Sequence, residues 1–330
     1  MHIDLRTVAI QPIRQTFDHV AARIGGDKPA SRYQEGTLGV QADVNFHYRP
    51  LWDPDHEIFD ETRTSIQMKD WYAFKDPRQF YYGTYALARA RMQETAEGDF
   101  DFVEQRGLAA TLSDTHRKLA LDVLLPLRHV EWGGNTNNAA ICAYGYGTAI
   151  TQPCIFQAMD HLGMAQYLTR VGLLLDEPAS IDVAKQNWLH SEVWQPLRRY
   201  VEDSFVVQDW FELFVAQNLV LDGLLYPLIY QHFDRAFSSQ AGPIVSMLTR
   251  FQAEWYSENI KWVSATIKTA ATESETNRQQ LSAWTETYRD RAISALLPVA
   301  ELAMGKQTDV VVAELIEEFN LRAGKVGLAL

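Results

Sequence analysis

Apolar residues recur every three or four positions through most of the chain after residue 76, and this spacing limits what the chain can fold into. Such a period places apolar side chains on one face of an α-helix. The clearest case starts at Thr151-Gln152-Pro153 and ends at Asp176-Glu177-Pro178. The sequence predicts one long helix here. Its expected buried face consists of Ile155, Ala158, Leu162, Ala165, Leu168, Val171 and Leu175.

Helical patterns also fill most of the remaining sequence. They cover about 180–204, 207–237, 241–270, 275–303 and 307–322. Asp76-Pro77 is typical of a further helix start, because Asp supplies a capping oxygen and Pro is favoured at the first helical position. The alternating patterns of strands are nearly absent, and no short repeat is visible. We therefore predict an all-α fold, a large helical bundle.

The first 70 residues differ from the rest in their sequence pattern. A short helical pattern at 12–24 precedes an irregular stretch, 46–60, that is rich in aromatic residues and prolines. A segment of this kind is not stable when exposed to water, so we expect it to lie against the helical body or against a partner. The predicted organisation is an extended amino-terminal segment, 1–70, that packs on a partner subunit, and a helical domain, 71–330.

Charge and composition exclude several classes of protein. The formal net charge of −12 argues against nucleic acid and membrane surfaces as partners, because such a surface repels phosphate groups. The most apolar stretch, 213–230, contains Gln217, Asn218 and Asp222, which predicts a buried core helix rather than a membrane span. Cys142 and Cys154 form no CxxC pattern and the start of the chain lacks the pattern of a secretory signal, so we expect a cytoplasmic protein.

The sequence carries none of the common catalytic signatures. GxxxxGK[ST] and GxSxG are missing, so nucleotide-driven and serine-based chemistry have no support. Di-iron bundles use Glu-x-x-His pairs, which direct two ligands at one point. None of the nine histidines has a glutamate three positions before it. Asp53-x-x-His56 is the pattern most similar to such a pair. Because Pro54 follows Asp53, this pattern indicates an aspartate that caps a turn next to a surface histidine.

Three segments resemble a known family. Residues 71–93, 46–60 and 28–36 are similar to the hydroxylase subunits of bacterial multicomponent monooxygenases, which include phenol, toluene and methane hydroxylases. The last two segments look most like the β chain of phenol hydroxylase. The resemblance implies a ferritin-like helical bundle, in which this chain is a non-catalytic structural β subunit.

The same resemblance implies the partners and the overall activity. The expected complex is α2β2γ2, with a di-iron centre in the α subunit and no cofactor bound by this chain. A regulatory protein and a reductase would act on the complex. The whole would be an NADH-dependent phenol 2-monooxygenase, which inserts one oxygen atom from O2 into an aromatic ring.

The α chain's iron ligands follow patterns that resemble F-x-x-x-D-E-x-x-H-x-Q and Q-x-D-E-x-x-H. The matching segments here are 156–166 and 252–258. Met164 stands at the histidine position of the first pattern, and its thioether is a soft ligand that suits iron of this type poorly. Trp255 stands at the glutamate position of the second pattern, and its indole N–H cannot bind a metal. We therefore expect a degenerate site with no metal and no catalytic residue. Its positions are Glu131, His161, Met164, Asp222, Trp255 and Glu258.

Two further expectations concern this degenerate site. Glu131 and His161 should face each other, with Trp255 filling the leftover volume, although Arg128 is a rival partner for Glu131. The alternative function is a helical metal-binding oxidoreductase with non-standard ligands, which would be Glu131, His161, Asp222 and Glu258. A third reading is a self-assembling helical protein without an enzymatic partner.

Overall fold

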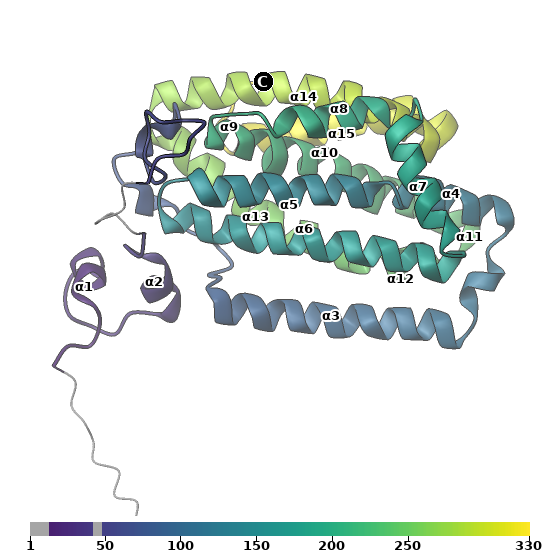
Figure 1. The fold of residues 1–330 in the computed structure, drawn as a ribbon, viewed down its shortest axis with the longest axis horizontal. Coiled ribbons are helices and arrows are strands. Elements are labelled where there is room, and N and C mark those ends of the chain that lie inside the picture. The colour runs from purple at the N-terminus through teal and green to yellow at the C-terminus, as the bar shows by residue number, and fades with distance from the viewer. Residues whose placement is uncertain (1–12, 42–47) are drawn as a thin grey trace, which may run out of the picture.

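The computed structural model describes residues 13–41 and 48–330, and these residues form helices and loops without a β-strand. The long helices lie side by side in layers (Figure 1), as the prediction of an all-α, ferritin-like bundle requires. The main elements are α3 (Tyr82–Gln105), α4 (Asp114–Leu124), α5 (Leu127–Tyr144), α6 (Thr148–Leu175), α7 (Ala179–His190), α8 (Gln195–Ser204), α13 (Arg250–Glu273), α14 (Glu275–Met304) and α15 (Thr308–Lys325).

A continuous helical stretch, 210–241, runs through the middle of the bundle. It consists of α9 (Trp210–Phe214), the π-helical turn η4 (Val215–Leu221), α10 (Asp222–Pro227), the π-helical turn η5 (Leu228–Phe233) and α11 (Asp234–Ala241). Every residue of 213–230 is buried. The stretch is apolar enough to cross a membrane, with a mean hydropathy of 1.4, but its apolar window is 100% buried inside the protein. The prediction of a core helix is confirmed.

Gln217 and Asn218 are paired within the bundle, whereas Asp222 Oδ2 and the Tyr230 hydroxyl have no hydrogen-bond partner among the described residues. Gln217 Nε2 donates to Asp222 Oδ1 over 2.8 Å, and Gln217 Oε1 accepts from Asn137 over 2.8 Å. Asn218 and Asn138 exchange two hydrogen bonds of 2.9 and 3.0 Å. Buried amides are stable only when they are paired in this way.

Two adjacent glycines of α5 let its neighbouring helices approach closely, Gly134 on the side of α6 and Gly133 on the side of α8. A Cβ on Gly134 would lie 2.7 Å from the ring of His161, and a Cβ on Gly133 would lie 2.5 Å from Val201 Cγ1. Neither ring nor methyl could stay in place beside an alanine. Gly134 therefore makes room for the imidazole of His161, and Gly133 makes room for Val201.

Several helix boundaries differ from the prediction. Asp76-Pro77 does not begin α3, which starts at Tyr82. The Asp76 carboxylate instead accepts a hydrogen bond from the Arg78 backbone N–H and pairs with the Arg78 guanidinium. Helix α6 starts at Thr148, before the expected Thr151. The predicted helix 180–204 is two helices, α7 and α8, and 241–270 is α12 (Ile244–Leu248) followed by α13. Proline and aspartate patterns mark turns as well as helix starts, which explains the first error.

The buried face of α6 agrees only in part with the one predicted. Ala158, Leu168, Val171 and Leu175 are buried, as expected. Ile155 and Leu162 are 37% and 46% exposed, whereas Gln157, Asp160 and His161 are buried. The period of the helix is correct, but the interior here is partly polar. Hydrophobicity alone therefore places Ile155 and Leu162 wrongly on the inner face and misses its polar members.

The described part of the amino-terminal segment contacts the chain's own body. Ile66 and Trp71 are buried in the core, and Asp209 accepts hydrogen bonds of 2.7 Å from the backbone and hydroxyl of Ser65. Asn277 similarly binds the backbone of Gln67. Only the second half of the helical pattern at 12–24 forms a helix, α1 (Asp18–Ile24), and Pro12 and residues 42–47 lie outside the described residues. A second short helix, α2 (Arg32–Thr37), follows.

A buried arginine holds the irregular stretch together. Arg63 donates to the carboxylate of Asp53 over 2.6 Å and to the backbone oxygens of His56 and Glu57. Asp53 also binds the ring of His56 over 2.9 Å. Asp53 therefore joins two turns of the loop, and His56 is its half-buried neighbour.

Candidate functional site

Polar side chains from three helices meet in the centre of the bundle. His161 on α6 lies between Glu131 on α5 and Asp222 on α10. His161 Nδ1 is 2.6 Å from Glu131 Oε2, and His161 Nε2 is 3.5 Å from Asp222 Oδ2. All three side chains are 1–2% exposed. The predicted pairing of Glu131 with His161 is confirmed, and Asp222 completes a triad.

Two opposing effects decide the charge of the imidazole. Burial disfavours its charged form, but the carboxylates of Asp222 and Glu131 outweigh burial and raise the pKa of His161 to about 10. At neutral pH the ring is therefore a cation with a proton on each nitrogen. Burial also raises the pKa of Glu131, and the hydrogen bonds from His161 and Tyr226 oppose that rise. The result is a histidine cation held between the carboxyl groups of Glu131 and Asp222.

The remaining volume around the triad is filled by aromatic and sulfur-containing side chains. Tyr226, one turn after Asp222, donates its hydroxyl proton to Glu131 over 2.8 Å, and its oxygen lies 3.4 Å from Met164 Sδ. The ring of Trp255 lies 5.1 Å from that of His161 and 4.9 Å from that of Tyr226, and the residue is completely buried. Trp255 fills this space, as predicted.

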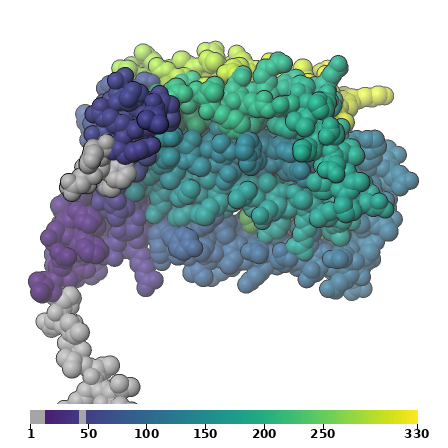
Figure 2. Space-filling view, in the orientation of Figure 1, coloured from purple at the N-terminus to yellow at the C-terminus, as the bar shows by residue number. Residues whose placement is uncertain are grey.

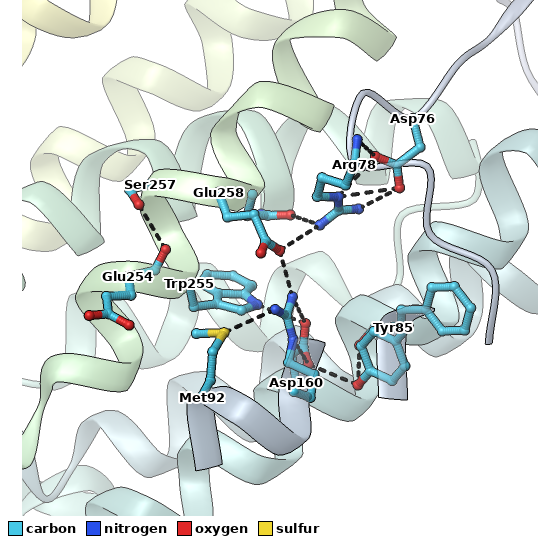
Figure 3. A network of polar contacts seen from close by, with 12 residues as sticks. Asp76, Arg78, Tyr85, Met92, Asp160, Glu254, Trp255, Ser257 and Glu258 are labelled. Carbon is cyan, nitrogen blue, oxygen red and sulfur yellow. Dashed lines mark hydrogen bonds and ion pairs between the residues drawn. The ribbon is translucent and has the colours of Figure 1, made fainter. Parts of the chain in front are cut away.

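The sixth position, Glu258, belongs to a second polar cluster (Figure 3). Its carboxylate accepts from Arg89 over 2.9 Å and lies 3.8 Å from Arg78. Asp160 is the centre of this cluster: it binds Arg89 through two bonds of 2.8 and 2.9 Å. Trp255 Nε1 and the Tyr85 hydroxyl also donate to Asp160, each over 2.8 Å. Trp255 therefore touches both clusters.

Sequence reasoning missed five residues of these two clusters, which are Arg78, Tyr85, Arg89, Asp160 and Tyr226. Tyr226 stands four positions after Asp222 on the same helix, so its spacing could have revealed it. Arg89 and Tyr85 are more than 70 positions from Asp160, and no local pattern connects them to it. The rival Arg128 interacts with the charge of Asp182 rather than with Glu131.

The donor set does not fit a di-iron centre. Trp255 uses its N–H as a donor to Asp160, so it offers no lone pair to a metal. Glu258 is bound to Arg89, and Met164 supplies only a thioether. Glu131 and Asp222, the two carboxylates in the right place, are compensated by His161. The ligand positions are thus occupied by ordinary side-chain interactions.

The chain is similar to proteins of known function along nearly its whole length. It is 50% identical to the phenol 2-monooxygenase oxygenase component DmpL of Pseudomonas sp. (strain CF600), over 99% of this chain and 98% of the relative. It is 23% identical to the toluene-4-monooxygenase hydroxylase component subunit beta of Ectopseudomonas mendocina, over 78% and 79% of the two chains.

A solved structure and a family model agree with these relatives. The crystal structure of xenon-pressurized phenol hydroxylase from Pseudomonas sp. OX1 superimposes with a TM-score of 0.93 and 46% identity, over 99% of both chains. A model of the methane/phenol/alkene hydroxylase family matches residues 52–274. This chain therefore belongs to the methane/phenol/alkene hydroxylase family.

Proposed function

We propose that this chain is the non-catalytic, structural β subunit of the hydroxylase component of a multicomponent phenol monooxygenase. The observation that carries the proposal is the Glu131–His161–Asp222 triad. A histidine cation and a buried tryptophan occupy the positions at which the catalytic subunit of this family would bind iron. The 50% identity to an oxygenase component of phenol 2-monooxygenase supplies the substrate class.

The proposed chemistry belongs to the complex. The α subunit would hold the di-iron centre and the aromatic substrate, and electrons from NADH would arrive through a reductase. A γ subunit would complete an α2β2γ2 assembly in the cytoplasm, and a regulatory protein would act on it. The relative of Ectopseudomonas mendocina is named as a beta subunit, which supports the assignment of this chain.

The amino-terminal segment is the proposed contact with the α subunit. Several of its large apolar side chains stay exposed although the neighbouring Ile66 and Trp71 are buried. Ile13 and Leu51 are almost fully exposed, and Phe17 and Trp52 are 52% and 54% exposed. Exposed apolar groups that gather in one segment are typical of a surface that a partner covers. A permanent subunit contact here would bury about 2,000 Å² or more.

The function is tested by purifying the chain through an affinity tag from cells that express all the hydroxylase genes. We expect a larger, iron-containing chain to co-purify, and the native mass to match α2β2γ2. The tagged chain separated from its partners should hold no stoichiometric iron. Two tightly bound irons on the isolated chain would instead establish the alternative, a metal-binding oxidoreductase with non-standard ligands.

A further inference from the structure

The two halves of α3 are packed in different ways. Ala96, Phe100 and Val103, in its second half, belong to the main hydrophobic core. In its first half Tyr85 instead joins a small separate cluster with Phe80 and Phe156. Local stability follows the amount of apolar surface buried in the main core. Of residues 82–93, only Met92 packs against the main core, so this half of the helix has less apolar anchoring there than the second half.

Arg89 holds this first half of α3 to the bundle through charge. Its guanidinium makes the two bonds to Asp160 on α6 and the bond to Glu258 on α13 described above, and it lies 5.4 Å from the centre of the Phe80 ring. The side chains of Arg89 and Asp160 are 11% and 3% exposed. Separating a pair this deeply buried is strongly disfavoured, because it leaves an uncompensated charge in the interior.

Apart from the bond of Tyr85 to Asp160 and the stacking of the Tyr85 ring on Phe156 of α6, the surroundings of this pair offer little support. A groove of about 320 Å³ separates the first half of α3 from α6, and Phe251 of α13 forms part of its lining. Figure 2 shows it as a hollow between the blue of α3 and the teal of α6, with green α13 atoms visible inside. Just before the helix, Gln79 has a φ of 52°, a left-handed conformation that is strained for a residue with a side chain.

We propose that residues 82–93 form a strap that opens and closes as a unit, and that Arg89 is its latch. In the closed state the Arg89–Asp160 pair draws the strap onto α6 and α13. When the pair separates, the strap leaves the bundle, and the relaxation of Gln79 favours that step. The second half of α3 stays in place, because Phe100 and Val103 remain in the core.

Hydrogen exchange of the full chain, followed by mass spectrometry, tests the latch. In Arg89→Gln, amides of 82–93 should exchange about 100-fold faster than in the unaltered chain, while those of 96–105, α5 and α6 change by less than about fivefold. Arg170→Gln is the matched control: it removes the other α3–α6 ion pair, Arg170–Glu97, whose side chains are 36% and 43% exposed. That variant should change exchange in 82–93 by less than about fivefold.

A double variant separates the latch from the cost of an unpaired carboxylate. Arg89→Gln with Asp160→Asn leaves no buried charge, so a latch predicts that 82–93 still exchanges fast. If exchange in the double variant returned to the normal rate, or if Arg89→Gln accelerated α5 and α6 as much as 82–93, the proposal would be overturned. Should Arg89→Gln not fold, Arg89→Lys, which keeps the charge but loses the two-pronged bond, must show the same selective acceleration in 82–93.

Discussion

Removing the carboxylate of Glu131 should destabilise the fold strongly, and the structure gives the size of the effect. Glu131→Ala leaves two buried donors without an acceptor, His161 Nδ1 and the Tyr226 hydroxyl, which now donate over 2.6 and 2.8 Å. Both bonds are made to a charged carboxylate, and a bond of this kind contributes about 1.5–3 kcal/mol. With the weakened compensation of the His161 charge, the expected loss is about 3–5 kcal/mol in the free energy of unfolding.

Urea unfolding followed by circular dichroism measures this loss in the isolated chain. The unfolding midpoint should fall by about 1 M or more. Glu131→Gln keeps an acceptor at the same place and should lose less, about 1–3 kcal/mol. Glu254→Ala is the control for a carboxylate in an exposed ion pair: Glu254 binds Arg250 over 2.8 Å and is 48% exposed. Its loss should stay below about 1 kcal/mol.

The comparison between Glu131→Ala and Glu254→Ala tests whether the triad stabilises the fold. If Glu131→Ala cost no more than Glu254→Ala, the triad would not be a stabilising element and the reasoning from its geometry would be refuted. The iron content of the assembled hydroxylase should be the same with either variant, because the triad holds no metal in the proposed function.

Three further predictions follow from the same structure. The pKa of His161 is raised from 6.5 to about 10 on folding, so the stabilisation of the fold by the charged imidazole is complete below pH 6.5 and is lost as the pH rises towards 10. Between these values the free energy of unfolding should fall by up to about 1.4 kcal/mol per pH unit, and His161→Gln should flatten this dependence on pH. The isolated chain should contain less than one iron in ten chains by atomic emission, and treatment with a chelator should leave its unfolding midpoint unchanged; a chelator-induced drop would contradict the structural role. Deleting residues 1–45 should release the α subunit in size-exclusion chromatography while the helical circular dichroism signal of 71–330 persists; normal assembly of the truncated chain would show that the contact lies elsewhere.

The sequence alone was sufficient for the helical class and for most of the helix positions. A period of 3.6 residues reports which positions of a segment share a face, and this information is local. It placed the end of α6 at Leu175 and predicted the buried stretch 213–230 correctly. It failed where the local signal is ambiguous, since Asp76-Pro77 forms a turn and not the start of α3.

The pairing of Glu131 with His161 was also accessible from the sequence, through the spacing that this chain shares with its family. The orientation of Glu258 was not, because the same spacing would direct it at the triad. Only the folded chain brings Arg89 beside it, and Arg89 stands 169 positions earlier. Distant charges attract in the tertiary structure and leave no periodic trace along the chain.

The polar interior of α6 has the same explanation. The pattern of Ile155 and Leu162 predicts a buried apolar face, yet both are exposed and Asp160 and His161 are inside. A charged side chain can be buried only when its partners are in place, and here they come from α3, α5, α10 and α13. The sequence by itself determined that α6 is a helix; the packing of four other helices decided which of its faces is the inner one, because only they supply the opposite charges and donors that make the burial of Asp160 and His161 favourable.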